Sequence, residues 1–252
     1  MSKTIGILGG MGPMATVDLF AKIVQSTPAS VDQEHLRIII DNNPQVPSRV
    51  NAIMHAGESP MAQLTSSAQV LEKAGVDFIV MPCNTAHHWI QELQRSVKVP
   101  ILNMITCAAA HAAERYPQLS GRILLLATIG TVHVRLYQNA FRDVGMQLEV
   151  PTPAEQKIVD AAIDAVKAGQ IENNPWLAQL DEIVRNHAAE AVLAGCTEIP
   201  LVFPHLKESF TRLDATAILA EKAVQQALTP ALEKELVRNR RVSGGQSLRH
   251  YP

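Results

Sequence analysis

Three things are scarce in this sequence: net charge, long apolar runs and cysteine. The 22 basic and 24 acidic residues leave a net charge of −2, which gives no electrostatic basis for binding nucleic acid or an anionic membrane. The longest apolar runs, such as residues 123–127, are far shorter than the roughly 18 residues that a membrane-spanning helix needs. We therefore expect a small-molecule partner, with no nucleic-acid partner and no membrane partner.

The small number of cysteines also narrows their possible roles, because three thiols cannot all pair. The apolar run before Gly9 is too short for a secretory signal, so we expect a cytoplasmic protein. Structural disulfides are rare in that reducing compartment, so each thiol either packs or does chemistry. Cys107 lies in the alanine-rich segment 106–113 and is expected to pack.

What the sequence has in abundance is apolar residues, which make up 47% of its 252 positions and can form a sizeable core. Short apolar runs alternate with alanine-rich amphipathic segments, which is typical of parallel βαβ units. In segment 56–75, for example, Leu64, Ala68 and Leu71 recur at helical spacing before Gly75. We expect strands at residues 4–8, 36–41, 77–81, 99–104, 122–127, 146–150 and 190–195.

The two halves of the chain resemble each other in outline, with Cys83 and Cys196 lying 113 residues apart (196 − 83) at matching points. An internal duplication explains this similarity between the halves better than chance does, and a chance origin is the alternative. The predicted fold class is therefore α/β, with two pseudo-symmetric lobes, each a mainly parallel sheet flanked by helices, and an active site in the cleft between them. We expect the lobes to comprise residues 1–104 plus 214–229 and residues 105–213. Residues 230–252, rich in arginine, are predicted to form a solvated tail, with a basic docking segment as the alternative.

The most informative residues are Cys83 and Cys196, each directly after a predicted strand. Open α/β sheets place their sites at the carboxyl ends of strands, so two facing lobes would put one thiol on each wall of a cleft. Asn84 and Thr85 are good helix N-cap types, which predicts a helix whose exposed N–H groups favour a Cys83 thiolate. Residues 197–198 give Cys196 polar neighbours as well. Burial as a small apolar side chain is the alternative for either cysteine.

A glycine-rich turn follows the first predicted strand, where Gly10, Gly12 and Ala15 satisfy G-x-G-x-x-A. A dinucleotide site is disfavoured, because Asp41 comes 31 residues after Gly10 (41 − 10) instead of about 20, and because Pro13 alters the helix start. Backbone amides at such a turn can also hold a substrate carboxylate. Three interpretations remain: a carboxylate site, a nucleotide site and a plain tight turn.

A metal site is not expected from the histidines and cysteines. Cys83 and His87 form only a C-x3-H pair with no second paired motif nearby, and the other histidines are scattered. His87 and His88 are expected either to be solvated or to support the site from behind its lining.

Five motifs, in order, carry a family resemblance: "GILGGMGP", "DNNPQVPSR", "MPCNTAHH", "VPILNM" and "AGCTEIPL". Between about Thr4 and Leu228 the chain resembles the aspartate/glutamate racemase family of cofactor-independent amino-acid racemases. Glu198 stands where glutamate racemases usually have histidine, which indicates the aspartate racemase branch. The resemblance implies two α/β lobes with the active site between them, no cofactor or metal, and a homodimer.

The resemblance also implies a two-base mechanism, in which one cysteine thiolate removes the α-proton and the opposite thiol protonates the other face. By motif, Cys83 and Cys196 are the catalytic pair, and Asn84, Thr85 and Thr197 hold the α-carboxylate or amino group of the substrate. Arg49 and Lys167 are cations suited to the carboxylates of an acidic amino acid. The substrate-binding set implied by the family is Met11, Gly12, Arg49, Asn84, Thr85, Thr128, Thr131, Lys167, Thr197 and Glu198.

Two departures from the family pattern bear on substrate preference. Ser48 stands where an aspartate is usual, and the segment 214–219 lacks an arginine that commonly follows its threonine. We therefore predict an enzyme that racemises aspartate, glutamate or both. The alternatives are a hydantoin racemase or maleate isomerase type of reaction, a non-catalytic protein that binds an acidic ligand, and a nicotinamide-dependent oxidoreductase.

Overall fold

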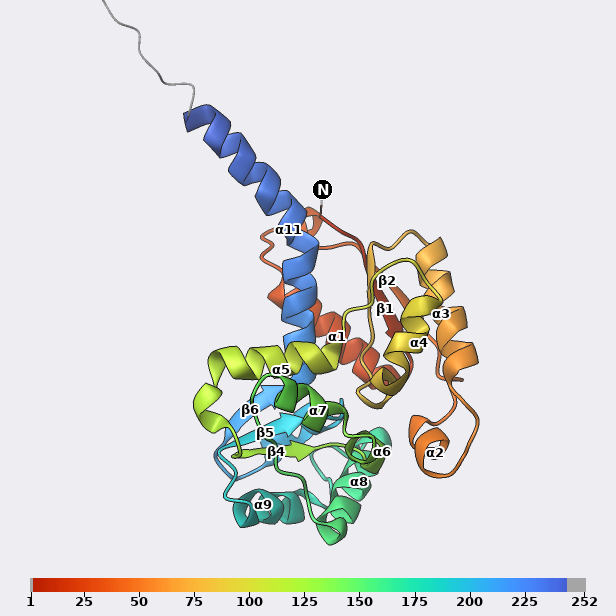
Figure 1. The fold of residues 1–252 in the computed structure, drawn as a ribbon, viewed down its shortest axis with the longest axis vertical. Coiled ribbons are helices and arrows are strands. Elements are labelled where there is room, and N and C mark those ends of the chain that lie inside the picture. The colour runs from red at the N-terminus through yellow and green to blue at the C-terminus, as the bar shows by residue number, and fades with distance from the viewer. Residues whose placement is uncertain (1, 244–252) are drawn as a thin grey trace, which may run out of the picture.

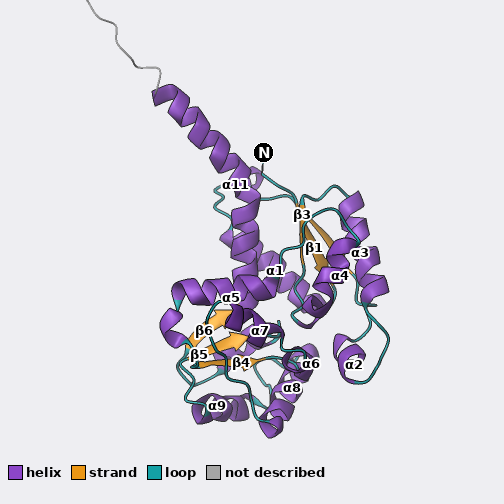
Figure 2. Cartoon of the chain, viewed as in Figure 1, coloured by secondary structure: helices purple, strands orange, loops and turns teal. Residues whose placement is uncertain are grey.

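Two separate parallel sheets organise the chain, and helices flank both of them (Figures 1 and 2). The computed structural model describes residues 2–243, with side chains as far as Thr229. The first sheet has the order β2-β1-β3, formed by β1 (Ile5–Gly9), β2 (Ile38–Asn42) and β3 (Phe78–Val80). The second has the order β4-β5-β6, formed by β4 (Ile123–Leu126), β5 (Ala191–Ala194) and β6 (Thr211–Asp214). These sheets and their helices confirm the predicted fold class; each sheet with its helices is called a lobe below.

At least one helix follows each of these strands. The helices are α1 (Pro13–Ser26), α2 (Arg49–Met54), α3 (Met61–Lys73), α4 (Ile90–Arg95), α5 (Met104–Arg115), α6 (Ile129–His133), α7 (Leu136–Asp143), α8 (Pro153–Lys167), α9 (Leu177–Asn186), α10 (Ile199–Val202) and α11 (Ala215–Ser243). Short 3₁₀ helices are η1 (Asp32–Glu34), η2 (Thr85–Trp89), η3 (Pro117–Leu119) and η4 (Phe203–His205). The predicted helix in segment 56–75 is α3, which buries Leu64, Ala68 and Leu71 and ends before Gly75.

The apolar runs form central strands because both of their faces are covered. Every residue of β1, β3, β4 and β5 is buried, as expected for parallel strands between layers of helices. In the first sheet Ile5 pairs with Ile38 and Phe78, and in the second Ile123 pairs with Ala191. The edge strand β2 is only partly buried.

The two sheets share one strand order once their isolated bridges are included. Ile101 pairs with Ile79 beyond β3, and Glu149 pairs with Leu124 beyond β4. The orders β2-β1-β3-Ile101 and Glu149-β4-β5-β6 therefore correspond, which supports two similarly built lobes. The strands predicted at residues 99–104 and 146–150 shrink to these single bridges, since Pro100 and Pro151 lack the N–H that a longer ladder needs.

A continuous apolar core joins the lobes. One cluster of buried side chains includes Phe78 from the first sheet, Leu125 from the second, Ala109 from α5 and Ala223 from α11. Helix α11 passes close to α1 and α5, so it links the two lobes (Figure 1). The exact lobe boundaries given above stay a prediction.

The last helix extends into the segment predicted to be a solvated tail. Helix α11 continues to Ser243, within the predicted tail of residues 230–252, and the solvation of this segment stays a prediction. The rest of the predicted tail, residues 244–252, lies outside the described residues. Within the described part of the chain, no helix combines the length and apolarity needed to cross a bilayer.

Candidate active site

Both thiols line one cavity between the lobes. Cys83 lies three residues after β3 (83 − 80) and Cys196 two residues after β5 (196 − 194), both at carboxyl ends of strands. The cavity has a volume of about 60 Å³. Its lining consists of Met11, Ser48, Arg49, Val50, Cys83, Asn84, Thr85, Thr128, Lys167, Cys196, Thr197 and Glu198. The structure thus brings together all the residues predicted for the site except Gly12 and Thr131.

The two remaining residues lie next to this cavity. Gly12 lines an adjoining apolar cavity of about 410 Å³, which shares Lys167, Thr197 and Glu198 with the first. Thr131 is fully buried behind the lining and hydrogen-bonds to Thr85.

The glycine-rich turn is tight, and its first amide donates a hydrogen bond within the protein. Gly10 has φ +94°, and a Cβ there would lie 2.3 Å from the backbone of Asn43, so only glycine fits. The Gly10 N–H donates to Thr16 Oγ1 at 2.9 Å and is not free to hold an anion. Gly10 therefore serves a tight turn, while ligand binding at Met11 and Gly12 stays a prediction. The turn brings Met11 to the cavity wall.

The turn after Cys83 differs from the predicted helix cap. Residues 85–89 form the 3₁₀ helix η2, and neither Asn84 nor Thr85 caps it with its side chain. Both side chains cross to the second lobe instead: Asn84 Oδ1 accepts a hydrogen bond from Tyr137, and Thr85 Oγ1 bonds to Thr128. The predicted cap is therefore wrong, because cross-lobe partners compete successfully for these polar groups.

Three threonine hydroxyls form a closed triangle at the lobe interface. The Oγ1 atoms of Thr85 and Thr128 are 3.0 Å apart, those of Thr85 and Thr131 2.9 Å, and those of Thr128 and Thr131 3.1 Å. A hydroxyl can donate once and accept twice, so each member can satisfy another. The triangle fixes Thr85, two residues after Cys83, against the start of α6.

His87 supports the same turn from behind. It is fully buried, and its Nε2 accepts from the Met104 N–H at 3.1 Å, so the proton must reside on Nδ1, which donates to the Cys83 carbonyl at 2.8 Å. Burial lowers the pKa of His87 to about 4, against weaker opposing backbone hydrogen bonds from Cys83 and Leu102. His87 is thus a neutral supporting group; of the two roles expected for it, the solvated one is wrong.

The second thiol lies against a carboxylate. Cys196 Sγ donates to Glu198 Oε2 at 2.9 Å, and Thr197 Oγ1 donates to the same oxygen at 3.1 Å. Burial, followed by the charge of Glu198 and this hydrogen bond, raises the pKa of Cys196 well above its usual range, although Lys167 opposes the shift. Cys196 is therefore a protonated thiol near neutral pH. The position corresponding to Glu198 after Cys83 is Thr85, so the two thiols have different surroundings.

Two cations approach the cavity from different lobes. The Nη1 of Arg49, at the start of α2, donates to the carbonyls of Val46 and Pro47 at 3.0 Å each. Lys167, the last residue of α8, lies 3.1 Å from Asp164 Oδ1. Burial lowers the pKa of Lys167, but Cys196, Asp164 and Glu198 together raise it by more than burial lowers it. The net pKa lies above its ordinary value, so this lysine stays charged. The site can therefore receive a ligand with two negative charges.

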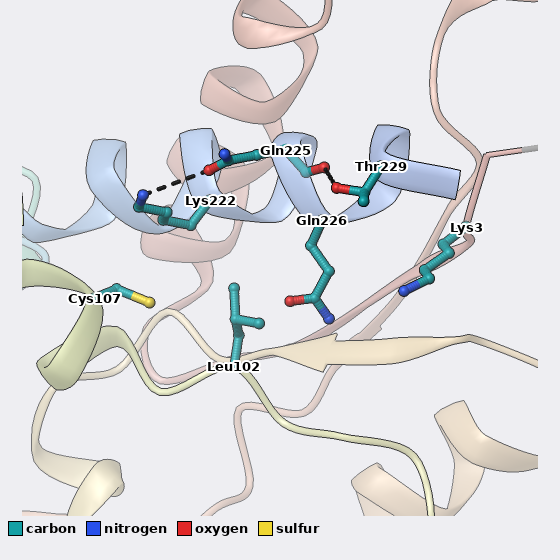
Figure 3. A pocket seen from close by; sticks show the side chains of 7 residues that line it. All are labelled: Lys3, Leu102, Cys107, Lys222, Gln225, Gln226 and Thr229. Carbon is teal, nitrogen blue, oxygen red and sulfur yellow. Dashed lines mark hydrogen bonds between the residues drawn. The ribbon is translucent and has the colours of Figure 1, made fainter. Parts of the chain in front are cut away.

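The third cysteine lies elsewhere. Cys107, on α5, lines a separate surface pocket beside α11 (Figure 3). Burial raises the pKa of this thiol, against a smaller opposing effect of Lys222. Its predicted packing role agrees with its partial burial against the core. The pocket is lined by Lys3, Leu102, Cys107, Lys222, Gln225, Gln226 and Thr229.

Sequence reasoning did not predict Val50 or Tyr137 near the site. Val50 lines the cavity, and Tyr137 contacts Asn84 from behind it. Val50 could have been found from its position next to Arg49, whereas nothing in the local pattern around Tyr137 indicates that its hydroxyl faces another lobe. Among the described residues, no group of three or more histidine, cysteine or acidic side chains has an arrangement that could hold a metal ion.

Comparisons with known proteins agree with this geometry. A family model described as Asp/Glu/Hydantoin racemase matches residues 8–223. The solved aspartate racemase of Picrophilus torridus superimposes with a TM-score of 0.79 and 32% identity, over 89% of this chain and 94% of that one. The broad specificity amino-acid racemase RacX of Bacillus subtilis (strain 168) is 28% identical over 233 residues, covering 89% of this chain and 98% of the relative. A glutamate racemase of Lysinibacillus sphaericus is 27% identical over 136 residues, 54% of this chain and 50% of the relative.

Proposed function

The chain belongs to the Asp/Glu/Hydantoin racemase family and is an amino-acid racemase, and from this premise we propose that it interconverts the enantiomers of aspartate, glutamate or both. The proposed reaction moves protons between Cα and two thiols, Cys83 and Cys196. We also propose that it needs no cofactor, takes place in the cytoplasm and is carried out by a homodimer.

One observation carries this proposal: the two thiols line the same small cavity while coming from different lobes. Inverting a stereocentre without turning the substrate requires a base on one face of Cα and an acid on the other. A single thiol cannot serve both faces. The arrangement therefore suits racemisation better than a reaction that needs one nucleophilic cysteine.

The unequal surroundings of the thiols suggest a resting state. Beside Glu198 the Cys196 thiol keeps its proton, which makes Cys196 the acid and Cys83 the base for the enantiomer whose α-hydrogen faces Cys83. After one turnover the proton positions are exchanged, and the opposite enantiomer is the substrate that fits. A free cysteine has a pKa of about 8.5 and gives little thiolate at neutral pH, so the surrounding site must assist the base.

The charges of the cavity favour an acidic amino acid. Arg49 and Lys167 offer two cations to a substrate with two carboxylates, and the side-chain amide of Asn84 and the hydroxyls of Thr85 and Thr197 offer hydrogen bonds to its α-substituents. The names of the relatives include aspartate, glutamate and broad specificity racemases, so the substrate range is left as aspartate, glutamate or both.

The proposal is tested by incubating the protein with L-aspartate and L-glutamate in deuterated water. We expect loss of optical rotation together with deuterium at Cα, detected by mass spectrometry, for at least one of the two. The absence of exchange with both acids would remove the proposed substrate class. Ligand-induced thermal stabilisation without exchange would instead indicate a non-catalytic binding protein.

A further inference from the structure

Tyr137 connects the two cysteine turns although it does not line the cavity. It lies on α7 in the second lobe, is fully buried, and donates its hydroxyl proton to Oδ1 of Asn84, the residue after Cys83 in the first lobe. Its ring also faces the other turn: a Cβ on Gly195, which precedes Cys196, would lie 3.3 Å from Tyr137 Cε2. One side chain thus contacts the residues next to both thiols.

The Tyr137 hydroxyl determines which end of the Asn84 amide is left free. An asparagine side chain has one accepting oxygen and an NH₂ group with two donors. A phenol that donates to the oxygen leaves the NH₂ group on the other side. Burial, assisted by the nearby Cys196, Asp214 and Cys107, raises the pKa of Tyr137 well above 10, so the hydroxyl remains a donor.

The freed NH₂ group has no partner among the described residues. Asn84 Nδ2 is buried and unpaired, while Asn84 itself lines the cavity that holds both thiols. A buried donor left unpaired is costly, so this nitrogen indicates an accepting group on a ligand. A carboxylate oxygen accepts hydrogen bonds, whereas an ammonium group only donates them. Because Asn84 adjoins Cys83, which must reach Cα, the α-carboxylate is the suitable acceptor.

We propose that Tyr137 is a positioning residue for racemisation, which holds the Asn84 amide with its NH₂ group toward the α-carboxylate of the substrate. The inference rests on the proposed function. Removal of the α-proton shifts negative charge onto the α-carboxylate oxygens, so a correctly oriented donor binds the transition state more tightly than the ground state. An amide that turns freely loses that difference.

The first test is Tyr137→Phe, which keeps the ring and removes only the hydroxyl. We expect kcat/KM to fall about tenfold, the scale of one misplaced hydrogen bond, with the loss visible in kcat as well as KM. Tyr116→Phe is the matched control, because Tyr116 directly follows α5 and is not among the residues that line the cavity, so this variant should keep wild-type kinetics. Unchanged kcat in a folded Tyr137→Phe protein would overturn the proposal.

A double-mutant cycle separates positioning from a general structural effect. If Tyr137 acts through Asn84, adding Tyr137→Phe to Asn84→Ala will cause no further loss of kcat. Losses that multiply in the double variant would contradict the proposal and leave the racemase assignment intact.

An NMR measurement tests the Tyr137–Asn84 contact without depending on turnover. The side-chain ¹⁵N–¹H signals of Asn84, identified by their absence in Asn84→Ala, should shift in Tyr137→Phe. No shift would refute the contact, whereas a shift in a protein without racemase activity would refute the proposed function alone.

Discussion

At the residue scale, the two thiols of the site are chemically unequal. Glu198 accepts a hydrogen bond from the Cys196 thiol, while the position two residues after Cys83 is Thr85, whose hydroxyl bonds to Thr128 and Thr131. The proposed two-thiol reaction needs one protonated and one deprotonated thiol at the start of each turnover. In the proposed reaction, burial and the neighbouring carboxylate therefore favour Cys196 as the cysteine that keeps its proton in the resting protein.

The role of Glu198 predicts a change in pH dependence. Burial and the Glu198 charge raise the pKa of Cys196, so replacing the carboxylate by an amide in Glu198→Gln should lower it. Cys196 then loses its acidic proton at a lower pH, and the alkaline limb of the kcat/KM profile should move in that direction. The profile of the enantiomer that reacts first at Cys83 should be compared between wild type and variant. Glu208→Gln is the control, because Glu208 pairs with Arg185 on the surface; an alkaline limb that stays in place in Glu198→Gln would exclude this role.

At the scale of secondary-structure elements, the ends of two strands position the two cysteines of the site. The strands β3 and β5 both end two or three residues before a cysteine, and short helices follow. The turn after β5 is closely packed: a Cβ on Gly195 would lie 2.5 Å from Leu125 Cδ1 and 2.8 Å from Ala127 Cβ. Cys196 is therefore held by the packing of β5 against β4 as well as by its own hydrogen bond.

This packing predicts a stability cost for Gly195→Ala. The added methyl group must displace β4 side chains or the turn itself, which typically costs about 1–3 kcal/mol. It should also lower kcat/KM, because Cys196 is the next residue. Urea denaturation and kinetics measure the two effects. Gly75→Ala is the control for activity: Gly75 has φ +81° in open space, so the variant should lose a similar amount of stability, about 1–2 kcal/mol of backbone strain, and leave kcat/KM unchanged. A Gly195→Ala protein with wild-type stability and activity would show that the turn is not tightly held.

At the scale of the whole molecule, most of the architecture could be predicted from the sequence. Continuous apolar runs indicated the central strands, because parallel strands buried on both faces leave no polar alternation. The strand β6 was not predicted, since its four residues, Thr211–Asp214, include only one buried side chain. The family motifs predicted most of the residues that line the cavity. The hydrogen bonds among these residues could not be predicted, because they form between side chains of different lobes. Asn84 and Thr85 look like helix caps locally and become cross-lobe hydrogen-bonding groups only when Tyr137 and Thr128 arrive.

The lobes are connected through a shared interior. Helices α5 and α11 contribute to one apolar cluster with both sheets, and the threonine triangle joins η2 to α6. Helix α2, which carries Arg49 into this interface, has no buried residue.

The central claim is that two thiols on separate lobes face opposite sides of one carbon, and single-thiol variants test it most directly. Cys83→Ser and Cys196→Ser should each abolish racemisation, while the thiol that remains can still exchange the α-hydrogen of the enantiomer that faces it. Measured with pure L- and D-substrate in deuterated water, the two variants should therefore exchange opposite enantiomers. Continued racemisation by either variant, or exchange of the same enantiomer by both, would contradict the account.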